Sequence, residues 1–228
     1  MKKFLTLVLM FVMAFSLVSC NKDDDDNGGN NNQQQQQQPA TEDVLVADTF
    51  AGLTTGKKVY LTTIGQSDID TVQNIMQNAD AEKVGFYTED EEPTTKDVNV
   101  YVDNLLAAGE VADGSVVFLV TGASTKGLGA AGTKITEENA RADAFATAAK
   151  ANKFTLVVLH VGGEQRRGTQ ADPIINKVVP AAKLVMVVNT GNADGLFTNL
   201  CSANSVSFNS YTRSSKMVAS FKKIFGLA

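Results

Sequence analysis

Apolar and polar residues follow two alternating patterns along the chain from residue 57 onward. Short runs rich in β-branched residues alternate with segments whose apolar residues recur at helical spacing. The runs predict strands at Lys57–Thr63, Lys83–Tyr87, Ser115–Thr121, Thr155–Val161 and Lys183–Asn189. The helical spacing predicts helices at Asp68–Ala79, Glu137–Ala151, Asp172–Ala182 and Asp194–Ala203. Three of the strands are almost continuously apolar, as expected for strands that helices cover on both faces.

Two segments depart from this regular alternation of strands and helices. Between residues 96 and 108, three valines alternate like a strand, but Leu105 to Ala108 favours a helix, and we interpret the segment as a helix. The tail Asn204–Ala228 is predicted to add a short edge strand and a closing helix at Lys216–Phe225.

This alternation predicts the fold class. Strands separated by helices form parallel pairs through right-handed crossovers. We therefore expect residues 42–228 to form a single α/β domain, a three-layer sandwich around a mainly parallel sheet of five or six strands. A flavodoxin-like or Rossmann-like order suits that number better than a barrel, which needs eight strands.

The first nineteen residues have the pattern of a signal peptide. A basic start, Met1-Lys2-Lys3, precedes an apolar run from Phe4 to Phe15, which is too short to span a bilayer. The run leads into Leu17-Val18-Ser19-Cys20, which resembles the bacterial lipobox, whose cysteine is acylated before cleavage. We expect Cys20 to carry acyl chains that attach the protein to a lipid bilayer. The alternative is an ordinary signal peptide with a chance cysteine.

Residues 20–41 are predicted to be a lipidated, disordered tether. Asn27 to Gln38 consists of Gly, Asn and Gln, which cannot bury enough apolar area to fold. Before it stands Lys22 followed by Asp23 to Asp26, which resembles the signal that sends some Gram-negative lipoproteins to the outer leaflet. We therefore predict an outer-membrane lipoprotein that faces the cell surface. A lipoprotein that faces the periplasm, with a solvated acidic spacer, is the alternative.

Charge and cysteine content exclude some classes of function. The chain of 228 residues has a net charge of −5 and a pI near 4.9, which argues against a nucleic-acid-binding protein. With Cys20 acylated, Cys201 has no partner in the chain for a disulfide. We expect Cys201 to be a small buried apolar residue, because no neighbour in the sequence favours a thiolate.

Glycine-rich turns follow four of the predicted strands. Ten of the eighteen glycines lie in residues 65–68, 122–132, 162–168 and 190–195. In a parallel sheet these turns share the carboxyl edge, where open α/β sheets bind ligands, and Lys126, Arg166 and Arg167 add positive charge there. The predicted contacts to a small anionic ligand are Gly65, Ser67, Gly122, Ser124, Lys126, Gly127, Gly129, Gly163, Arg166, Arg167 and Asn192. For the two arginines, a solvated loop pair is the alternative.

No cofactor or metal motif is complete. Gly127 to Gly132 has dinucleotide-motif spacing, but it starts six residues after the strand and we expect its helix to begin later still. Leu128 stands where a P-loop needs lysine, and no serine sits in a nucleophile elbow. His160 is the sole histidine, too few for a typical zinc site, and the acidic run Glu89–Glu92 lacks the spacing of a calcium loop. We therefore predict no metal, and the cofactor stays unknown.

His160 and Glu164 are the candidates for acid/base chemistry. They are four residues apart near the end of a predicted strand, and hydroxyl groups of Ser67 or Ser124 could serve as nucleophile. The simpler interpretation is a strand-end histidine that hydrogen bonds to the backbone.

Four stretches resemble an uncharacterised bacterial family, a domain of unknown function found in secreted and lipid-anchored proteins. They are Thr62-Thr63-Ile64-Gly65-Gln66-Ser67, Ser124-Thr125-Lys126-Gly127-Leu128-Gly129-Ala130-Ala131-Gly132, His160-Val161-Gly162-Gly163-Glu164-Gln165-Arg166-Arg167-Gly168 and Gly191-Asn192-Ala193-Asp194-Gly195-Leu196-Phe197. The likeness covers roughly residues 57–205. It implies a common α/β domain and brings no established activity.

Three functions follow as hypotheses. The first is a lipoprotein that binds a small anionic ligand at the glycine-rich carboxyl edge. The second is a hydrolase or transferase that acts on such a ligand through His160 and Glu164. The third is a structural module for protein interaction, in which the glycine turns are only tight connections.

Overall fold

The computed structural model describes residues 43–87, 93–94 and 107–228. The predicted signal peptide, Cys20 and the tether lie outside these residues, as do the acidic run Glu89–Glu92 and nearly all of the predicted helix at 96–108.

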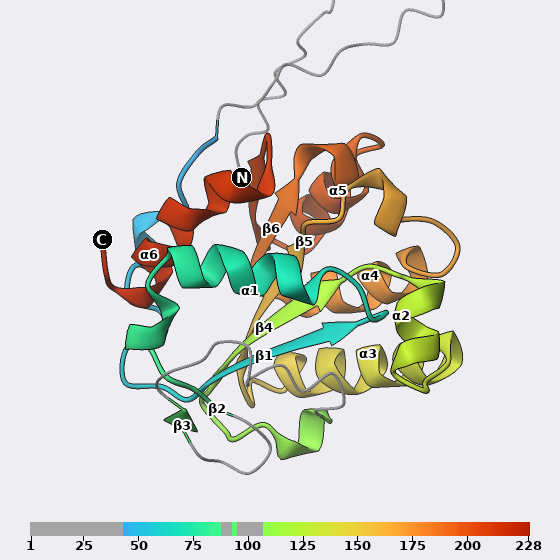
Figure 1. Cartoon of the computed structure of the whole chain (residues 1–228), viewed down its shortest axis with the longest axis horizontal. Helices are drawn as coiled ribbons and strands as arrows, with labels where there is room; N and C mark the ends of the chain where they lie inside the picture. Colours follow the sequence, from blue (N-terminus) through green and yellow to red (C-terminus); the bar gives the residue numbers. More distant parts are fainter. Residues whose placement is uncertain (1–42, 88–92, 95–106) are drawn as a thin grey trace, which may run out of the picture. The chain divides into compact units, whose positions relative to one another are not determined.

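A five-stranded parallel sheet forms the centre of the domain (Figure 1). Its strands, in spatial order, are β1 (Val59–Ile64), β4 (Val116–Thr121), β5 (Thr155–His160), β6 (Leu184–Val188) and β7 (Ser207–Tyr211). In register, Val59 lies opposite Val116, and Leu184 lies opposite Ser207. The first four of these strands are almost entirely buried, which agrees with their apolar sequences, whereas the edge strand β7 is largely half-exposed.

Helices cover both faces of the sheet. Helices α1 (Ile69–Asn78) and α6 (Val218–Phe225) pack on one face, where Met76 and Phe221 are fully buried. Helices α3 (Ile135–Lys150), α4 (Asp172–Val178) and α5 (Leu196–Ala203) pack on the other. The predicted three-layer α/β sandwich, flavodoxin-like or Rossmann-like, is confirmed, and so is the strand and helix of the tail.

The predicted strand at 83–87 differs most from the structure. Only β2 (Phe86–Tyr87) forms, and it pairs antiparallel with β3 (Pro93–Thr94) in a separate two-stranded sheet. Residues Ala81–Lys83 instead form the 3₁₀ turn η2, and Gly85 has a positive φ of 74° that interrupts an extended strand. β2 still lies beside β1.

One helix was not expected. Residues 125–130 belong to a predicted glycine-rich turn, but they form α2 (Thr125–Ala130). Ser124 caps this helix, because its Oγ accepts a hydrogen bond from Gly127 N at 3.1 Å. The remaining short elements are the 3₁₀ turns η1 (Asp48–Phe50), η4 (Ala108–Glu110), η5 (Glu164–Arg166), η6 (Val179–Ala181), η7 (Asn189–Asn192) and η8 (Ser214–Met217).

The first described residues run along α6. Asp43 accepts a hydrogen bond from Thr212 N at 2.7 Å, just after the carboxyl end of β7, and Val46 N donates to Ser220 Oγ at 3.3 Å. Lys223 Nζ donates to Val46 O at 2.8 Å. The chain therefore enters the described domain at the carboxyl edge of the sheet.

Cys201 is buried in α5, with 2% of its surface exposed. Burial raises the pKa of its thiol to about 12, which leaves it protonated at neutral pH. This confirms the prediction of a buried apolar residue.

Candidate functional site

The connections that leave β1 and β4 run to opposite faces of the sheet. β1 leads through residues 65–68 into α1 on one face, whereas the neighbouring β4 leads through α2 into α3 on the other. Open α/β sheets bind ligands where neighbouring connections diverge in this way, at the carboxyl ends of the strands. We call this place, formed by residues 65–68 and 122–124, the switch point.

Glycines at the switch point and in the adjoining α2 allow the backbone there to pack closely. A methyl group on Gly65 would lie 1.9 Å from Gly122 O, and one on Gly127 would lie 1.9 Å from Gln66 O. Ser124 N donates to Gly65 O at 3.0 Å, which ties the two turns together. The structure therefore supports a packing role for Gly65, Gly122 and Gly127, where the sequence suggested backbone open to a ligand.

Ser67, Asp68 and Arg166 meet over this glycine backbone, and we call them the switch-point cluster. A methyl group on Gly122 would lie 2.4 Å from Ser67 Oγ. A methyl group on Gly162 would lie 2.2 Å from Asp68 Oδ2 and 2.1 Å from Arg166 Cγ. Arg166 Nε donates to Asp68 Oδ1 at 3.2 Å. The absence of side chains at the two glycines thus makes room for this cluster.

Two atoms of the cluster have no hydrogen-bond partner. In the described part of the chain, the buried side-chain oxygens without one are Ser67 Oγ and Asp68 Oδ2. Ser67 is 5% exposed, and Gln66 and Asp68 both have left-handed backbone conformations, with φ of 59° and 62°. Unsatisfied buried polar atoms and strained backbone concentrate at sites that bind a further group.

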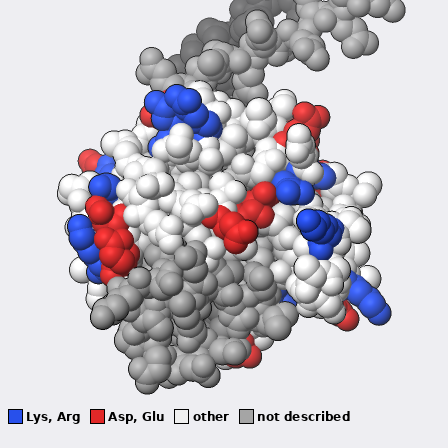
Figure 2. All heavy atoms as spheres, in the orientation of Figure 1, with Lys and Arg blue, Asp and Glu red and all other residues white. Residues whose placement is uncertain are grey.

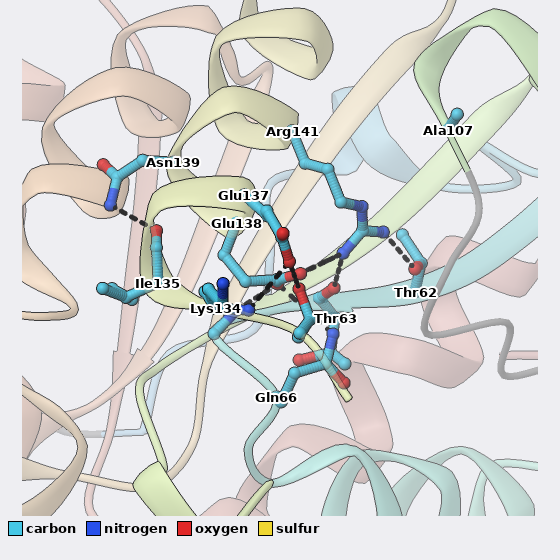
Figure 3. Close-up of polar contacts among 12 residues, drawn as sticks. Thr62, Thr63, Gln66, Ala107, Lys134, Ile135, Glu137, Glu138, Asn139 and Arg141 are labelled. Carbon is cyan, nitrogen blue, oxygen red and sulfur yellow. Dashed lines mark hydrogen bonds and ion pairs between the residues drawn. The ribbon is translucent and has the colours of Figure 1, made fainter. Parts of the chain in front are cut away.

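A buried ion pair of α3 stabilises the turn after β1, which is the first turn of the switch point (Figure 3). Glu138 of α3 is fully buried, and its carboxylate accepts hydrogen bonds from Gly65 N at 2.7 Å and Gln66 Nε2 at 3.3 Å. Arg141 Nη1 lies 3.2 Å from the same carboxylate and donates to Thr63 O at 3.0 Å. The end of β1 and its turn are therefore fixed to α3.

Sequence reasoning missed Glu138 and Arg141, although a signal was present. Glu138 lies on the stripe that continues through Ala142, Phe145 and Ala149, which are buried against the sheet. A carboxylate on the apolar stripe of a helix is either paired or functional, because burying a lone charge is costly.

Arg167 has a structural environment that differs from that of Arg166. Its guanidinium donates to Asp172 Oδ1 at 2.7 Å, to Asp194 Oδ2 at 2.8 Å and to Gly191 O, and it lies 5.5 Å from the centre of the Phe197 ring. Burial opposes its charge, but the bonds to Asp172 and Asp194 outweigh burial, so the Arg167 pKa is raised. This arrangement links the turns after β5 and β6 to the start of α4 and supports a structural role.

His160 is completely buried at the end of β5. Its Nδ1 lies 2.9 Å from Thr121 O and its Nε2 lies 3.0 Å from Gly163 O. Both ring nitrogens therefore face backbone carbonyls, and the ring packs 5.1 Å from that of Phe197. This geometry supports the simpler interpretation of His160 as a strand-end histidine that hydrogen bonds to the backbone, because both ring nitrogens lie against carbonyl oxygens.

The environment of His160 predicts a pH dependence of stability. Burial lowers the His160 pKa, against the opposing effect of the Gly163 and Thr121 carbonyls. Since the unfolded chain then binds the proton more readily, the free energy of unfolding should fall as pH drops below about 6.5, by up to about 1.4 kcal/mol per pH unit. Urea unfolding at pH 7.5, 6.5 and 5.5 measures this slope. A His160→Gln variant should lose it, and an unchanged slope in that variant would contradict the assignment.

The other predicted contacts lie around the same edge. Asn192 Oδ1 accepts hydrogen bonds from Phe197 N at 2.9 Å and Thr198 N at 3.3 Å, so Asn192 caps α5. Gly163 makes room for Thr190, whose Oγ1 would lie 2.5 Å from a methyl group there. Lys126 and Gly129 are exposed on α2. Glu164 is exposed and lines a pocket of about 350 Å³ beside Arg167 and Asp194.

Two further pockets lie at the opposite, amino edge of the sheet. The larger, of about 610 Å³, is lined by Lys57, Lys58 and Lys83 with Phe225. The other, of about 420 Å³, lies between Phe50 and Phe154. Neither of these two pockets is lined by Ser67 or Asp68.

The described residues show neither a metal cluster nor a membrane-spanning helix. Residues 43–87, 93–94 and 107–228 contain no group of three or more His, Cys, Asp or Glu side chains placed to hold a metal ion. No helix in the same described ranges has the length and apolar character needed to span a membrane.

Comparison with known proteins identifies the family. The chain matches no curated protein and no solved structure. The model of one family, described as a domain of unknown function, DUF6305, matches residues 56–225, which is more than half of the chain and includes every strand of the central sheet. The chain therefore belongs to the DUF6305 family of domains of unknown function.

Proposed function

We propose that this protein is a lipid-anchored binding protein whose α/β domain holds a small anionic ligand at the switch point. The observation that carries the proposal is the switch-point cluster, where a buried hydroxyl, a carboxylate oxygen and an arginine converge with unused hydrogen-bonding capacity. Ligands of open α/β sheets bind at this place in the fold.

Positive charge at the cluster favours an anion. Arg166 bonds to Asp68 through Nε alone, its side chain is 38% exposed, and its terminal nitrogens make no hydrogen bond with any described residue. Lys126 is exposed on α2, which packs on the switch point through Gly127. Figure 2 shows acidic side chains in the middle of the face that carries α1, with basic side chains beside them toward α2. An arginine fork with free nitrogens suits a carboxylate or phosphate.

Thermal unfolding in the presence of anions tests the binding. A panel of phosphorylated, sulfated and carboxylated small molecules is added to the wild type, each at its highest soluble concentration. A ligand whose concentration is then about 100 times its Kd should raise the Tm by about 5–10 °C. The Lys126→Gln/Arg166→Gln variant should lose this rise.

A matched pair of lysines at the other edge provides the control. Lys150 ends α3 and Lys153 lies two residues before β5, and both are exposed at the amino edge. The Lys150→Gln/Lys153→Gln variant removes the same charge and should keep the full rise. If no anion stabilises the wild type more than the Lys126→Gln/Arg166→Gln variant, the binding proposal fails.

We further propose that acylated Cys20 attaches the protein to the outer membrane, facing the cell surface. Support comes from the lipobox-like sequence before Cys20 and from the acidic run Asp23–Asp26. Asp43, the first described residue, accepts a hydrogen bond from Thr212 N just after the carboxyl end of β7.

Replacing Cys20 tests the anchor. In the native host, wild-type protein should appear in the membrane fraction and carry acyl chains on its mature N-terminus by mass spectrometry. Cys20→Ala should remove the acyl chains, and with them the mature acylated form, because the chains are attached through this cysteine. Cys201→Ala, the control, should leave acylation unchanged. Acyl chains that persist in Cys20→Ala would refute the assignment.

The orientation is tested on intact cells. Added protease should degrade the wild type while leaving a periplasmic marker intact. Protection of the protein until the outer membrane is permeabilised would instead establish the periplasm-facing alternative.

A further inference from the structure

The switch-point cluster also indicates what kind of anion it accepts, an inference that rests on the proposed function. Asp68 Oδ2 and Ser67 Oγ are buried without hydrogen-bond partners, and Arg166 lies beside them. Its Cβ and Cγ, like these two oxygens, lie close to where a methyl group on Gly122 or Gly162 would be. The cluster therefore combines the Arg166 guanidinium, which has free N–H donors, with the Asp68 Oδ2 oxygen, which has no donor to accept from.

A simple anion satisfies only half of this arrangement. An ionised carboxylate accepts hydrogen bonds and donates none, whereas the guanidinium donates and cannot accept. A sulfate or a phosphate without other polar groups would bond to Arg166 and repel Asp68. Asp68 Oδ2 gains a partner only from a group that brings an N–H or O–H.

Access to Asp68 Oδ2 depends on Arg166. The single bond from Nε, at 3.2 Å, holds the partly exposed arginine over the carboxylate, whose own side chain is only 13% exposed. An anion that bonds to the terminal nitrogens of Arg166 draws the guanidinium outward and uncovers Asp68 for the second polar group of the same ligand.

We infer that the ligand is a small acid that carries a hydroxyl or ammonium donor near its acidic group. Its acidic group bonds to Arg166, and its donor bonds to Asp68 Oδ2, with Ser67 Oγ as a neighbouring partner. Hydroxylated and amino-bearing acids share this chemistry, and the test separates them.

Three phosphate monoesters of similar size test the inference by titration calorimetry. At about pH 8, where phosphate monoesters are fully ionised, ethyl phosphate has no donor, glycerol 3-phosphate has hydroxyl groups, and O-phosphoethanolamine has an ammonium group. Glycerol 3-phosphate or O-phosphoethanolamine should bind the wild type about tenfold more tightly than ethyl phosphate, the value expected for a hydrogen bond to a charged group. Whichever of these two esters binds more tightly shows whether the site prefers a hydroxyl or an ammonium donor.

The variant Asp68→Asn tests whether the Asp68 carboxylate causes this preference. Asparagine is close in shape and tolerates the left-handed backbone of this position, so the fold should be kept, and circular dichroism checks this. In this variant the tenfold preference should disappear, with ethyl phosphate bound at least as tightly as by the wild type. Ser67→Ala should reduce the preference without abolishing binding.

The outcomes separate this inference from the proposed function. Equal affinity of all three esters for the wild type, or a preference that survives Asp68→Asn, overturns the inference while anion binding stands. If none of the three binds and no anion in the thermal panel does, the proposed function itself fails.

Discussion

Replacing Glu138 by Leu is expected to lower the free energy of unfolding by about 3–5 kcal/mol, the usual cost of removing one partner of a buried ion pair. Glu138 is fully buried and accepts hydrogen bonds from Gly65 N and Gln66 Nε2 while it pairs with Arg141 at 3.2 Å. Without it, Arg141 keeps a charge that is mostly buried, and the turn after β1 loses its acceptor. Urea unfolding followed by circular dichroism measures the change.

Two further variants show whether the ion pair causes the loss. The double variant Glu138→Leu/Arg141→Met should recover part of the stability, because it removes the uncompensated charge as well. Asp143→Asn alters an exposed carboxylate of the same helix, paired with Lys177 at 2.8 Å, and should cost less than about 1 kcal/mol. A Glu138→Leu variant no less stable than Asp143→Asn would contradict the role of the pair.

Replacing Gly65 by Ala is expected to cost about 3 kcal/mol or more, from overpacking and a strained backbone together. The added methyl group would lie 1.9 Å from Gly122 O, and Gly65 has a φ of 92° that residues with a Cβ rarely adopt. Since the carbonyl belongs to the backbone of the neighbouring turn, it cannot rotate away as a side chain would. Urea unfolding again measures the loss.

Gly114→Ala separates the two causes. Gly114 has a φ of 79°, similar to that of Gly65, but a methyl group there would meet nothing within 4 Å. It should therefore cost only the backbone strain, about 1–2 kcal/mol. Equal losses in the two variants would mean that the close packing of the turns at the switch point contributes nothing.

Most of the fold could be predicted from the sequence because it is encoded in local patterns. Buried parallel strands such as Val116–Thr121 appear as continuous apolar runs, and α1 and α3 appear through helical spacing. The patterns failed where local sequence was ambiguous. Gly127 and Gly129 are poor helix formers, yet they lie in α2, because the Ser124 cap and the close packing of Gly127 on Gln66 stabilise a short helix there.

The candidate site could be predicted only in part. The order of elements places residues 65–68 and the Arg166 turn at one edge, which the alternation of strands and helices already indicated. The partners inside that edge are separated by long stretches of sequence: Asp68 and Arg166 are 98 residues apart, and Gly65 and Glu138 are 73 apart. For the same reason the sequence could not distinguish Arg167, which binds Asp172 and Asp194, from its neighbour Arg166.

The central claim is that the switch point binds a small anion, and a crystal structure tests it most directly. The protein is crystallised with the anion that gives the largest thermal shift. The account predicts electron density for the anion within hydrogen-bond distance of the Arg166 terminal nitrogens, with Arg166 moved off Asp68. Density for the anion only at the lysines of the amino edge, with Arg166 still bonded to Asp68, would contradict it.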